Sequence, residues 1–401
     1  MVGTGPVGFA TADRLRRAKY QVSLINSKTT LGVRRTFPAA AAFWTPFASG
    51  MTPKDEQNRS ELTLNFYHDI LEDPGYSMEE TGIVNRQLDM HFLKDTLSHT
   101  PDWSKFPKLK FQRLKKAPYS IFDIAKFPEL KRVLRGSAEV RAEFRYETPT
   151  IQVDRFMNWY SKRLQNELHV NVIDVSFPFV GPNSLKSHEW LEQWRKLIFD
   201  HQINHLVVCV GSNTVFGDLI SPHYPSEDSF NPLKGVVAHL EIRPTKQCST
   251  ILFEGGFFDT DTLYLVPLID RYVLGGTVHS VGRRDDESSW QVQEAEKKGI
   301  IERAQCFLPK KHKNLLQKSG LFDSPMNEQI TWMAGVRPKL RNGPIVMESD
   351  VLSDFISSPK APDKTLVFLH YGHGGSGFTM CHDSAEQVVN ELGKRLAPEA
   401  N

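Results

Sequence analysis

Two glycine-rich segments near opposite ends of the sequence are the first candidates for chemistry. The early one, Gly3-Thr-Gly-Pro-Val-Gly8, leads directly into an amphipathic stretch that begins at Phe9. Glycines between a strand and a helix let backbone amides approach a diphosphate, whose charge the helix N-terminus also favours. The early segment therefore predicts a nucleotide site, with a glycine turn that only packs as the alternative.

The usual companion of such a turn is missing at its expected place. An acidic residue about 20 positions further on normally receives the ribose hydroxyls, but here the second strand ends in Asn26-Ser27-Lys28. Asn26 or Ser27 could hydrogen-bond a ribose, more weakly than a carboxylate would. The first strand is also short, because only Met1 and Val2 precede the turn.

The late segment, Gly372-His-Gly-Gly-Ser-Gly377, places four glycines within six residues between an apolar strand and a helix expected from Ser384. Such backbone freedom indicates close contact with a ligand and strengthens the nucleotide prediction. His370 and His373 have the spacing of a pair of metal ligands. The adjoining glycines and the lack of nearby carboxylates argue against that reading, so no metal is expected.

A third segment, Gly335-Val-Arg-Pro338, holds an arginine between glycine and proline at a strand edge. A guanidinium fixed in this way suits bidentate binding of a carboxylate. The alternative is a surface ion pair, and these four residues alone favour neither.

The elements that must position these residues alternate between strand and helix at both ends of the chain. Residues 21–26, 205–210 and 365–370 read as strands, and residues 9–20, 153–168 and 384–396 as helices. The apolar runs at 205–210 and 365–370 are typical of strands buried on both faces of a parallel sheet. Residues 263–267 and 272–277 predict strands joined by a turn, and a helix is expected over 289–307.

Composition narrows the classes of partner. The 401 residues predict two or three domains, and 49 basic against 47 acidic residues leave a net charge of +2. Neither nucleic acid nor a membrane is therefore an expected partner. A basic stretch from Lys105 to Lys116 is interpreted as solvated surface, with steering of an anionic substrate as the alternative.

The cellular location is predicted from features that the sequence lacks. The four cysteines form no disulfide pattern, which indicates a reducing compartment. No apolar run approaches the roughly 18 residues needed to cross a bilayer, and no signal peptide or peroxisomal C-terminus is present. A cytoplasmic location is expected.

The segments occur together, and in this order, in one family: the chain resembles the D-amino-acid oxidases and their D-aspartate-oxidase and glycine-oxidase relatives. The matching text is Gly3-Thr-Gly-Pro-Val-Gly8, Ala40-Ala-Ala-Phe-Trp-Thr-Pro-Phe47, Tyr264-Leu-Val-Pro267, Leu274-Gly-Gly276, Gly335-Val-Arg-Pro338 and His370-Tyr-Gly-His-Gly-Gly-Ser-Gly-Phe-Thr379. The resemblance implies an α/β fold with two domains. A Rossmann-like FAD-binding domain would comprise residues 1–50, 147–220 and 340–401, and an antiparallel-sheet α+β substrate domain residues 51–146 and 221–339.

The same resemblance implies FAD as the cofactor and assigns residues to each part of it. The diphosphate would contact Thr4, Gly5, Pro6 and Val7, and the adenosine ribose would lie near Ser27 and Lys28. The flavin would be lined by Thr36, Ala41, Ala42 and Phe43, and its pyrimidine edge by Gly374, Gly375, Ser376, Gly377, Phe378 and Thr379.

For the substrate, the resemblance implies a small amino acid that bears a carboxylate. Arg337 would pair with the α-carboxylate, Tyr264 would donate to the same group, and the Gly375 carbonyl would accept from the amine. A second tyrosine of the family would fall at Thr260, so substrate choice and lid closure stay open.

The implied reaction transfers hydride from the α-carbon to flavin N5 without a side-chain base. O₂ would be reduced to H₂O₂, with release of keto acid and ammonia. A homodimer is a candidate assembly, and the oligomeric state stays open. Two alternatives remain. One is a flavin dehydrogenase or tailoring amine oxidase acting on another amino acid or a secondary amine. The other is an inactive flavin-fold binding protein, which the missing acidic residue and the short first strand would suit.

Overall fold

The structure is a computed structural model that describes most of the chain. The described residues are 1–27, 37–46, 53–92, 100–114, 142–176, 188–209, 211, 230–245, 248–257, 261–281, 291–323, 328–340, 343–357 and 365–396. Within these ranges, no helix combines the length and the apolar character that crossing a bilayer requires.

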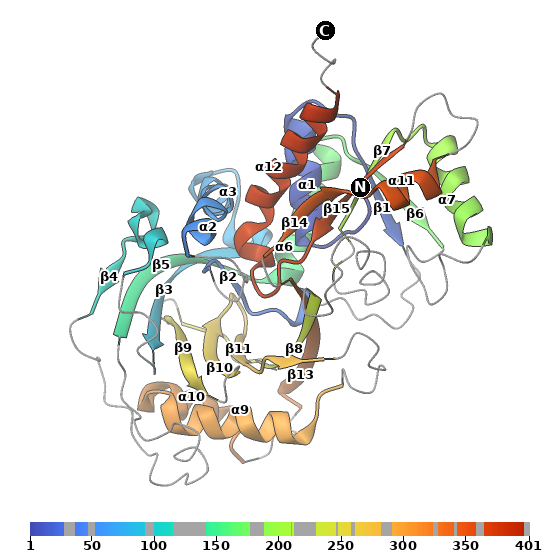
Figure 1. The fold of residues 1–401 in the computed structure, drawn as a ribbon. Helices are drawn as coiled ribbons and strands as arrows, with labels where there is room; N and C mark the ends of the chain where they lie inside the picture. The colour runs from blue at the N-terminus through green and yellow to red at the C-terminus, as the bar shows by residue number, and fades with distance from the viewer. Residues whose placement is uncertain are drawn as a thin grey trace.

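A mostly parallel sheet lies beside the N-terminus in the upper part of Figure 1. Its strands are β1 (Ser23–Ser27), β6 (Asn171–Val175), β7 (His205–Val208), β14 (Ile345–Glu348) and β15 (Leu366–Tyr371). β1 pairs in parallel with β6, β15 in parallel with β7, and β14 runs antiparallel to β15. Val2 bridges Ile25 on one side and Val208 on the other. The short first strand therefore lies between β1 and β7 and joins the two groups.

Helices pack around this sheet and carry the two glycine segments. α1 (Pro6–Arg17) packs against α12 (Gly377–Leu396), which also contacts α3 (Glu61–Glu72). The other helices of this part are α2 (Pro53–Asn58), α4 (Met78–Thr81), α6 (Val153–Asn166), α7 (His188–Asp200) and α11 (Asp350–Ile356). Each glycine segment thus ends in a helix N-terminus, and the two helices lie side by side (Figure 1).

The prediction for the start of α12 was wrong. The helix begins at Gly377 rather than near Ser384, and the Met380 N–H donates to the Ser376 carbonyl at 3.0 Å. The missed part, residues 377–383, consists mostly of residue types with a low helix propensity: one glycine with Phe, Thr, Cys, His and Asp. The late glycine loop is consequently shorter than expected, and Phe378 belongs to the helix.

Two other helices differ from their predicted limits. α1 begins at Pro6, three residues before Phe9, because proline suits the first turn of a helix. α9 (Glu294–Phe307) begins after residues 291–293, which were included in the predicted helix. Its start is set by a capping box in which Gln293 and Glu296 bond each other's backbone.

A curved sheet of ten strands forms the lower part of Figure 1. Its strands are β2 (Ala42–Phe43), β3 (Ile83–Phe92), β4 (Gln112–Arg113), β5 (Ala142–Ile151), β8 (Phe230–Leu240), β9 (Thr250–Phe257), β10 (Asp261–Pro267), β11 (Tyr272–Gly275), β12 (His279–Ser280) and β13 (Ile330–Leu340). The path runs β12-β8-β11-β10-β9-β3-β5-β2, with β13 on β8 and β4 on β5. The described residues also form three short helices, η1 (Phe37–Ala39), η2 (Asp102–Lys105) and η3 (Pro107–Leu109). The domain limits at 146/147 and 339/340 fall within strands and stay a prediction.

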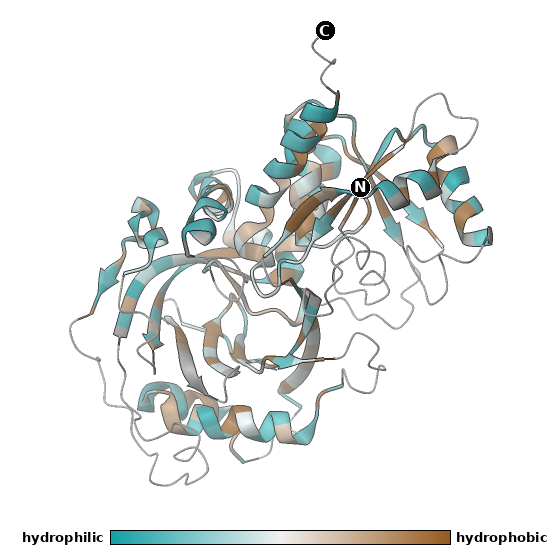
Figure 2. Cartoon of the chain, viewed as in Figure 1, coloured by the Kyte–Doolittle hydropathy of each residue, from teal (hydrophilic) through white to brown (hydrophobic). Residues whose placement is uncertain are grey.

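The two faces of the curved sheet have different neighbours, because side chains alternate along a strand. The outer face packs against α9 and α10 (Lys310–Lys318) in a closed apolar core. Leu265 and Leu274 of the sheet and Ile300 and Phe307 of α9 are fully buried there. Figure 2 shows apolar and polar residues alternating along α9, as expected of a helix with one buried side. The inner face looks toward the glycine segments.

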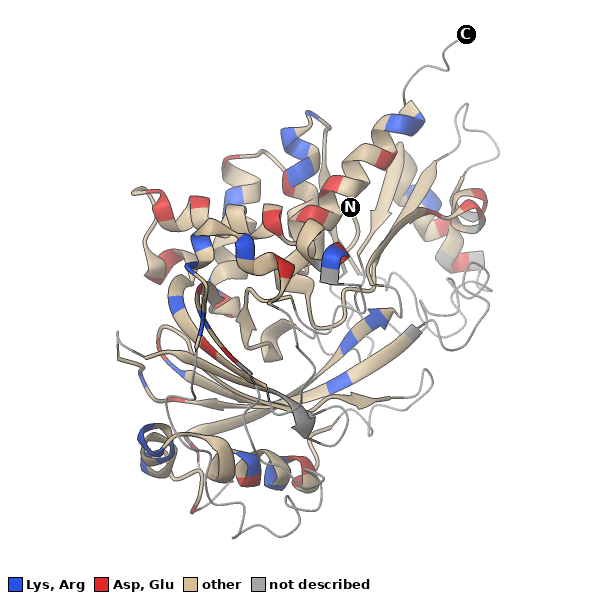
Figure 3. Ribbon diagram, turned by 60° about the vertical axis from the view of Figure 1, so that its left-hand side comes forward, with Lys and Arg blue, Asp and Glu red and all other residues tan. Residues whose placement is uncertain are grey.

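The basic stretch that begins at Lys105 lies among acidic partners. Lys105 pairs with Asp102 at 2.9 Å and Lys110 with Glu147 at 3.0 Å. Lys115 and Lys116 lie outside the described residues. Figure 3 likewise shows basic and acidic residues interspersed over the helices. This pairing agrees with the interpretation of the stretch as solvated surface.

Candidate functional site

The early glycine segment turns tightly against the strands beside it. Gly3 has a φ of 109°, and a Cβ there would overlap the Cys209 carbonyl oxygen. A Cβ on Gly8 would overlap the carbonyl oxygen of Gly3 in the same way. Only glycine permits this path, which brings the N-terminus of α1 to the edge of the parallel sheet. The first amides of a helix have no intrahelical partners and are available to an anion.

A cavity of about 540 Å³, here called the edge cavity, lies beside this turn. That volume is within the range of small-molecule sites. Its described lining residues are Thr4, Phe9, Leu24, Asn26, Phe37, Pro38, Ala40, Val153, Asp154, Met157, Asn158, Ser161, Val172, His239, Leu268, Arg271 and Met333. Thr4 Oγ1 donates to Asn26 Oδ1 at 3.2 Å, and Asn26 Nδ2 donates to Asp174 Oδ1 at 2.9 Å. Polar groups thus connect the early turn with β6.

The residues predicted for the diphosphate and the ribose are described only in part. Thr4 lines the edge cavity, and Gly5, Pro6 and Val7 form the N-cap and first turn of α1. Ser27 ends β1, whereas Lys28, Thr36 and the lid position Thr260 lie outside the described residues.

A second cavity of about 100 Å³, here called the face cavity, lies on the inner face of the curved sheet. Its described lining residues are Ala39, Ala40, Ala41, Ala42, Phe43, Thr45, Leu233, Gly235, Val237, Leu252, Thr262, Tyr264, Val278, Gly335, Arg337, Gly375 and Phe378. This set includes all three predicted substrate residues together with Ala41, Ala42 and Phe43 from the predicted flavin lining. Ala40 lines both cavities, so the two adjoin.

Arg337 projects from β13 over the neighbouring strand β8. β13 and β8 are antiparallel, with Gly335 opposite Gly235, and a Cβ on Gly235 would overlap the Arg337 guanidinium. The guanidinium donates to the Thr277 carbonyl at 3.4 Å, and it lies close enough to the Tyr264 phenol to affect the pKa of that group. Among the residues that the structure describes, no carboxylate forms an ion pair with it. A surface ion pair therefore does not explain Arg337 within this part of the chain.

Tyr264 is buried beside Arg337. Gly275, the last residue of the neighbouring strand β11, and Gly276 after it leave room for the tyrosine ring. A Cβ on Gly276 would lie 2.9 Å from the tyrosine hydroxyl, and one on Gly275 would overlap the ring. Phe43 packs edge-on against the ring at 6.4 Å between centroids. Burial raises the pKa of Tyr264 above its usual 10.0, although Arg337 opposes that shift. The phenol is therefore a protonated donor at neutral pH.

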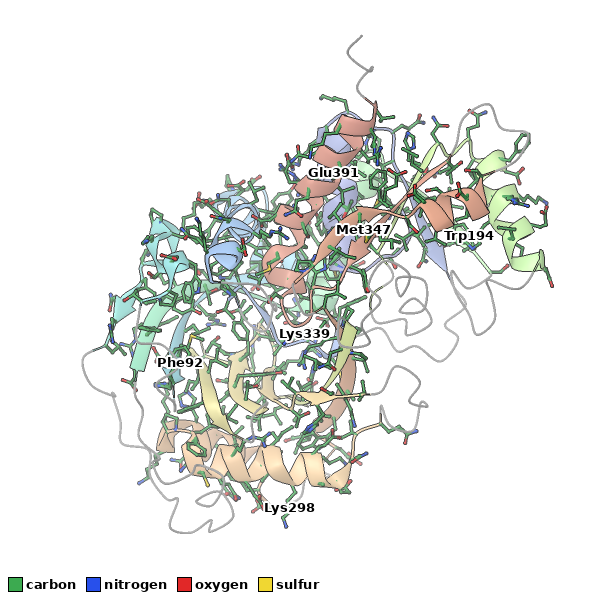
Figure 4. The ribbon with its side chains drawn as sticks, viewed as in Figure 1. Phe92, Trp194, Lys298, Lys339, Met347 and Glu391 are labelled. Atoms are coloured by element: carbon green, nitrogen blue, oxygen red, sulfur yellow. The ribbon has the colours of Figure 1, made fainter. Side chains whose placement is uncertain are left out.

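The late glycine loop is attached to the strand that carries Arg337. Gly374 has a φ of 54°, and its N–H donates to the Pro338 carbonyl at 2.8 Å. The next residue of β13, Lys339, forms a β-bridge with His373. Figure 4 labels Lys339 at this junction between the curved sheet and the upper part of the molecule. The attachment brings Gly375 to the face cavity.

The remaining late residues divide into lining and supporting positions. Phe378 lines the face cavity, and Gly377 opens α12. Ser376 and Thr379 are buried and are not among the described lining residues. The Thr379 hydroxyl donates to the Thr45 carbonyl at 2.8 Å, which ties α12 to the segment that contains Ala41–Phe43.

The histidine pair is buried and bonded to hydroxyl groups. His370 Nδ1 lies 3.0 Å from Thr11 Oγ1, and His373 Nε2 lies 2.8 Å from Ser384 Oγ. Burial lowers the pKa of both imidazoles, to about 3 for His373. Within the described ranges, no group of three potential metal ligands occurs.

Two contributors to the site were missed in the sequence. Gly235 makes room for the Arg337 guanidinium, and Thr277 provides its carbonyl partner. A glycine inside a strand indicates close approach of another group, so Gly235 carried a readable signal. Thr277 carried none, because its role depends on a backbone carbonyl that any residue has.

The described residues fit FAD. The glycine turn at Gly3 and Gly8 leaves no room for side chains and presents the start of a helix, as a diphosphate site requires. The edge cavity runs from that turn to Ala40, where it adjoins the face cavity. FAD would therefore be held by the early turn at one end and by the residues of the face cavity at the other.

Comparisons with solved structures support this assignment of the fold. Glycine oxidase from Bacillus cereus ATCC 14579 has a TM-score of 0.59 at 14% identity, covering 100% of this chain and 98% of that one. L-proline dehydrogenase from P. horikoshii has a TM-score of 0.59 at 13% sequence identity, covering 98% of this chain and 92% of that one. Iminodiacetate oxidase from Chelativorans sp. BNC1 has a TM-score of 0.57 at 15% sequence identity, covering 100% of this chain and 96% of that one. These similarities confirm the predicted mixed α/β fold.

A direct comparison with curated protein sequences gives no match. The family model described as FAD dependent oxidoreductase, or DAO, matches residues 1–390. That match spans nearly all of the chain, including both glycine segments and Arg337. The chain therefore belongs to the DAO family of FAD-dependent oxidoreductases, and FAD is its cofactor.

Proposed function

We propose that this enzyme oxidises the carbon–nitrogen bond of a small D-amino acid, with O₂ as the electron acceptor. The observation that carries the proposal is the half-buried Arg337 in the face cavity, with no carboxylate partner among the described residues. A guanidinium in such a cavity suits a ligand carboxylate, which it can bind through two parallel hydrogen bonds. Tyr264 adds a neutral donor next to it.

The proposed reaction balances without a side-chain acid or base. The amino acid, O₂ and water give the keto acid, ammonium and H₂O₂. When bound, FAD supplies the two-electron chemistry by accepting hydride from the substrate and passing electrons to O₂. The protein would orient the substrate and keep water away from it.

Each cavity residue has a proposed part in that orientation. Arg337 and Tyr264 would hold the carboxylate, and the Gly375 carbonyl would accept a hydrogen bond from the amine. Most of the described lining is apolar or small, including Leu233, Val237 and Leu252. An apolar site favours the neutral amine over the ammonium, because burial disfavours the charged form. The neutral amine is the form that can lose hydride.

A substrate panel tests the proposal. FAD-loaded protein is incubated with each D- and L-amino acid, with glycine and with small secondary amino acids, while H₂O₂ and ammonia are measured. We expect peroxide with at least one D-amino acid and the strongest response with small side chains. Inactivity toward the entire panel, with FAD fully bound, would refute the proposal.

The second candidate is a dehydrogenase or oxidase of the same fold that acts on a secondary amine or an L-amino acid. It is favoured by the fold similarity to the P. horikoshii L-proline dehydrogenase and the Chelativorans iminodiacetate oxidase. An artificial electron acceptor in the same panel separates the candidates. Turnover of a secondary amine with that acceptor but not with O₂ would favour the dehydrogenase.

A further inference from the structure

A carboxylate, that of Asp174, lies at the carboxyl edge of the parallel sheet, on the strand next to the one that carries the acidic residue in most dinucleotide-binding folds. In those folds an acidic residue at the end of the second strand receives the ribose hydroxyls. Here that strand is β1, and Asn26 stands near its end. Asp174 is the register partner of Asn26 on the adjacent strand β6, and its Oδ1 accepts from Asn26 Nδ2 at 2.9 Å.

The side chain of Asn26 is oriented from both sides. Its Oδ1 accepts from Thr4 Oγ1 at 3.2 Å, while its Nδ2 donates to Asp174. Both Thr4 and Asn26 line the edge cavity next to the glycine turn. The pair Asn26–Asp174 thus extends from the turn expected to bind the diphosphate toward the outer strand of the sheet.

Asp174 lies on the side of the sheet that faces the edge cavity. Side chains two residues apart on a strand share a face, so Asp174 shares one with Val172, which lines that cavity. Asp174 is itself exposed, so a ligand can reach it. An ionised carboxylate has about four acceptor sites and can receive hydrogen bonds from several donors at once.

We propose that Asp174, together with Asn26, binds the hydroxyls of the adenosine ribose of FAD. The carboxylate that the end of β1 lacks is then supplied by β6. A ribose diol presents two donors, and a charged acceptor binds a donor more strongly than an amide oxygen does. This inference rests on FAD as the cofactor and is independent of the substrate proposed above.

A purely structural role for Asp174 makes different predictions. β1 and β6 are already joined by five consecutive register pairs, from Ser23↔Asn171 to Ser27↔Val175. If Asp174 only supports this pairing, its removal lowers the stability of the apoprotein and has no effect that depends on the ribose. If it binds ribose, the loss depends on the hydroxyls of the ligand.

The test measures the Kd of FAD for apoprotein by flavin fluorescence, together with the thermal unfolding of the apoprotein. Asp174→Ala should raise the Kd roughly 10- to 100-fold, the range of a hydrogen bond to a charged group. Asp200→Ala, at the exposed end of α7, is the matched control and should leave the Kd unchanged. An unchanged Kd in Asp174→Ala would overturn the inference.

A charge exchange keeps the test valid if Asp174→Ala folds poorly. Asn26→Asp alone places two carboxylates side by side and should weaken FAD binding. The double variant Asn26→Asp/Asp174→Asn restores one carboxylate and one amide, and should bind FAD within about threefold of wild type, since hydrogen-bond chemistry is conserved. If the double variant binds FAD no more tightly than Asn26→Asp does, the proposal is wrong.

An FAD analogue with 2′,3′-dideoxyadenosine completes the design. Wild type and Asp174→Ala should bind it with similar Kd, because the groups that Asp174 recognises are gone. If Asp174→Ala weakens binding of FAD and of the analogue by the same factor, the carboxylate acts elsewhere and the proposal is wrong. None of these measurements involves turnover, so a failed amino-acid panel and a failed ribose assignment are separate outcomes.

Discussion

The two faces of the curved sheet are built from the same strands but have opposite character. On β10, Leu263 and Leu265 belong to the closed core with α9, whereas Thr262 and Tyr264 line the face cavity. The outer face is filled by large apolar side chains. On the inner face, Gly235, Gly275 and Gly276 leave the space that Arg337 and Tyr264 occupy.

This difference shows how one strand can serve stability and binding separately. Because neighbouring side chains point to opposite faces, a change at one position leaves the other face almost intact. Substitutions on the outer face should therefore alter the free energy of unfolding, and substitutions on the inner face the recognition of substrate.

The largest effect is expected from Arg337→Met. Loss of two charge-assisted hydrogen bonds, at about 1.5–3 kcal/mol each, should lower kcat/KM roughly 10²- to 10⁴-fold. The melting temperature should change little. Arg243→Met, at an exposed arginine beyond β8, is the matched control. Steady-state kinetics with the best substrate of the panel measures kcat/KM for both variants. A wild-type kcat/KM in Arg337→Met would show that the inner face does not recognise the substrate through this residue.

On the outer face, Leu265→Ala should lower the free energy of unfolding by about 2–5 kcal/mol, because a large buried side chain is removed from a closed core. Urea denaturation measures the loss. KM should remain at the wild-type value in the folded fraction. A KM shift as large as that of an inner-face variant would show that the faces are coupled.

Removal of FAD should affect the inner side of the molecule more than the outer side. Free FAD at 100 times its Kd stabilises the folded protein by about 2.7 kcal/mol. Hydrogen exchange of the apoprotein should increase mainly at residues 37–46 and 372–379, which border the cavities. An equal increase in α9 would contradict the separation.

Gly235→Ala should raise KM roughly tenfold, because its Cβ would displace the Arg337 guanidinium and overpacking costs about 1–3 kcal/mol. The matched control is Gly393→Ala near the end of α12, where nothing lies within 4 Å of the new Cβ. That change should stabilise the protein by about 0.5–1 kcal/mol. Similar kinetics in the two variants would argue against a role for Gly235.

The smallest effect is expected from Tyr264→Phe, which removes one hydrogen bond to the substrate carboxylate while Arg337 still pairs with that group. A loss of about 1–1.4 kcal/mol should raise KM roughly five- to tenfold. Burial raises the pKa of Tyr264 above 10.0. Its contribution should therefore persist through neutral pH and disappear only as pH rises past that value. A ratio of variant to wild-type KM that changes between pH 6 and 8 would contradict this.

The sequence allowed most of the site to be predicted where chemistry depends on residue type. The two glycine segments, Arg337 and Tyr264 were each recognisable, and the structure brings the late segment, Arg337 and Tyr264 to one cavity and the early segment to the adjoining one. The helical start at Gly377 was not recognisable, because local propensity opposes it and tertiary contacts such as Thr379 with Thr45 fix it.

The features that could not be predicted from the sequence depend on pairing between strands that are distant in the chain. Gly235 lies opposite Gly335 only because β8 and β13 align in one register out of several possible ones. The proximity of Asp174 to Asn26 likewise follows from the pairing of β1 with β6, which lie far apart in the chain at residues 23–27 and 171–175. No local sequence pattern predicts either strand pairing.

Carboxylate binding at equilibrium tests the central claim most directly. FAD-loaded wild type and Arg337→Met are titrated with small carboxylates such as benzoate and acetate while the flavin absorption spectrum is followed. We expect a saturable spectral change in wild type. The response should be lost, or the carboxylate affinity weakened at least 100-fold, in Arg337→Met, which should retain FAD. Equal carboxylate affinity in the two proteins, or no spectral response in wild type, would contradict it.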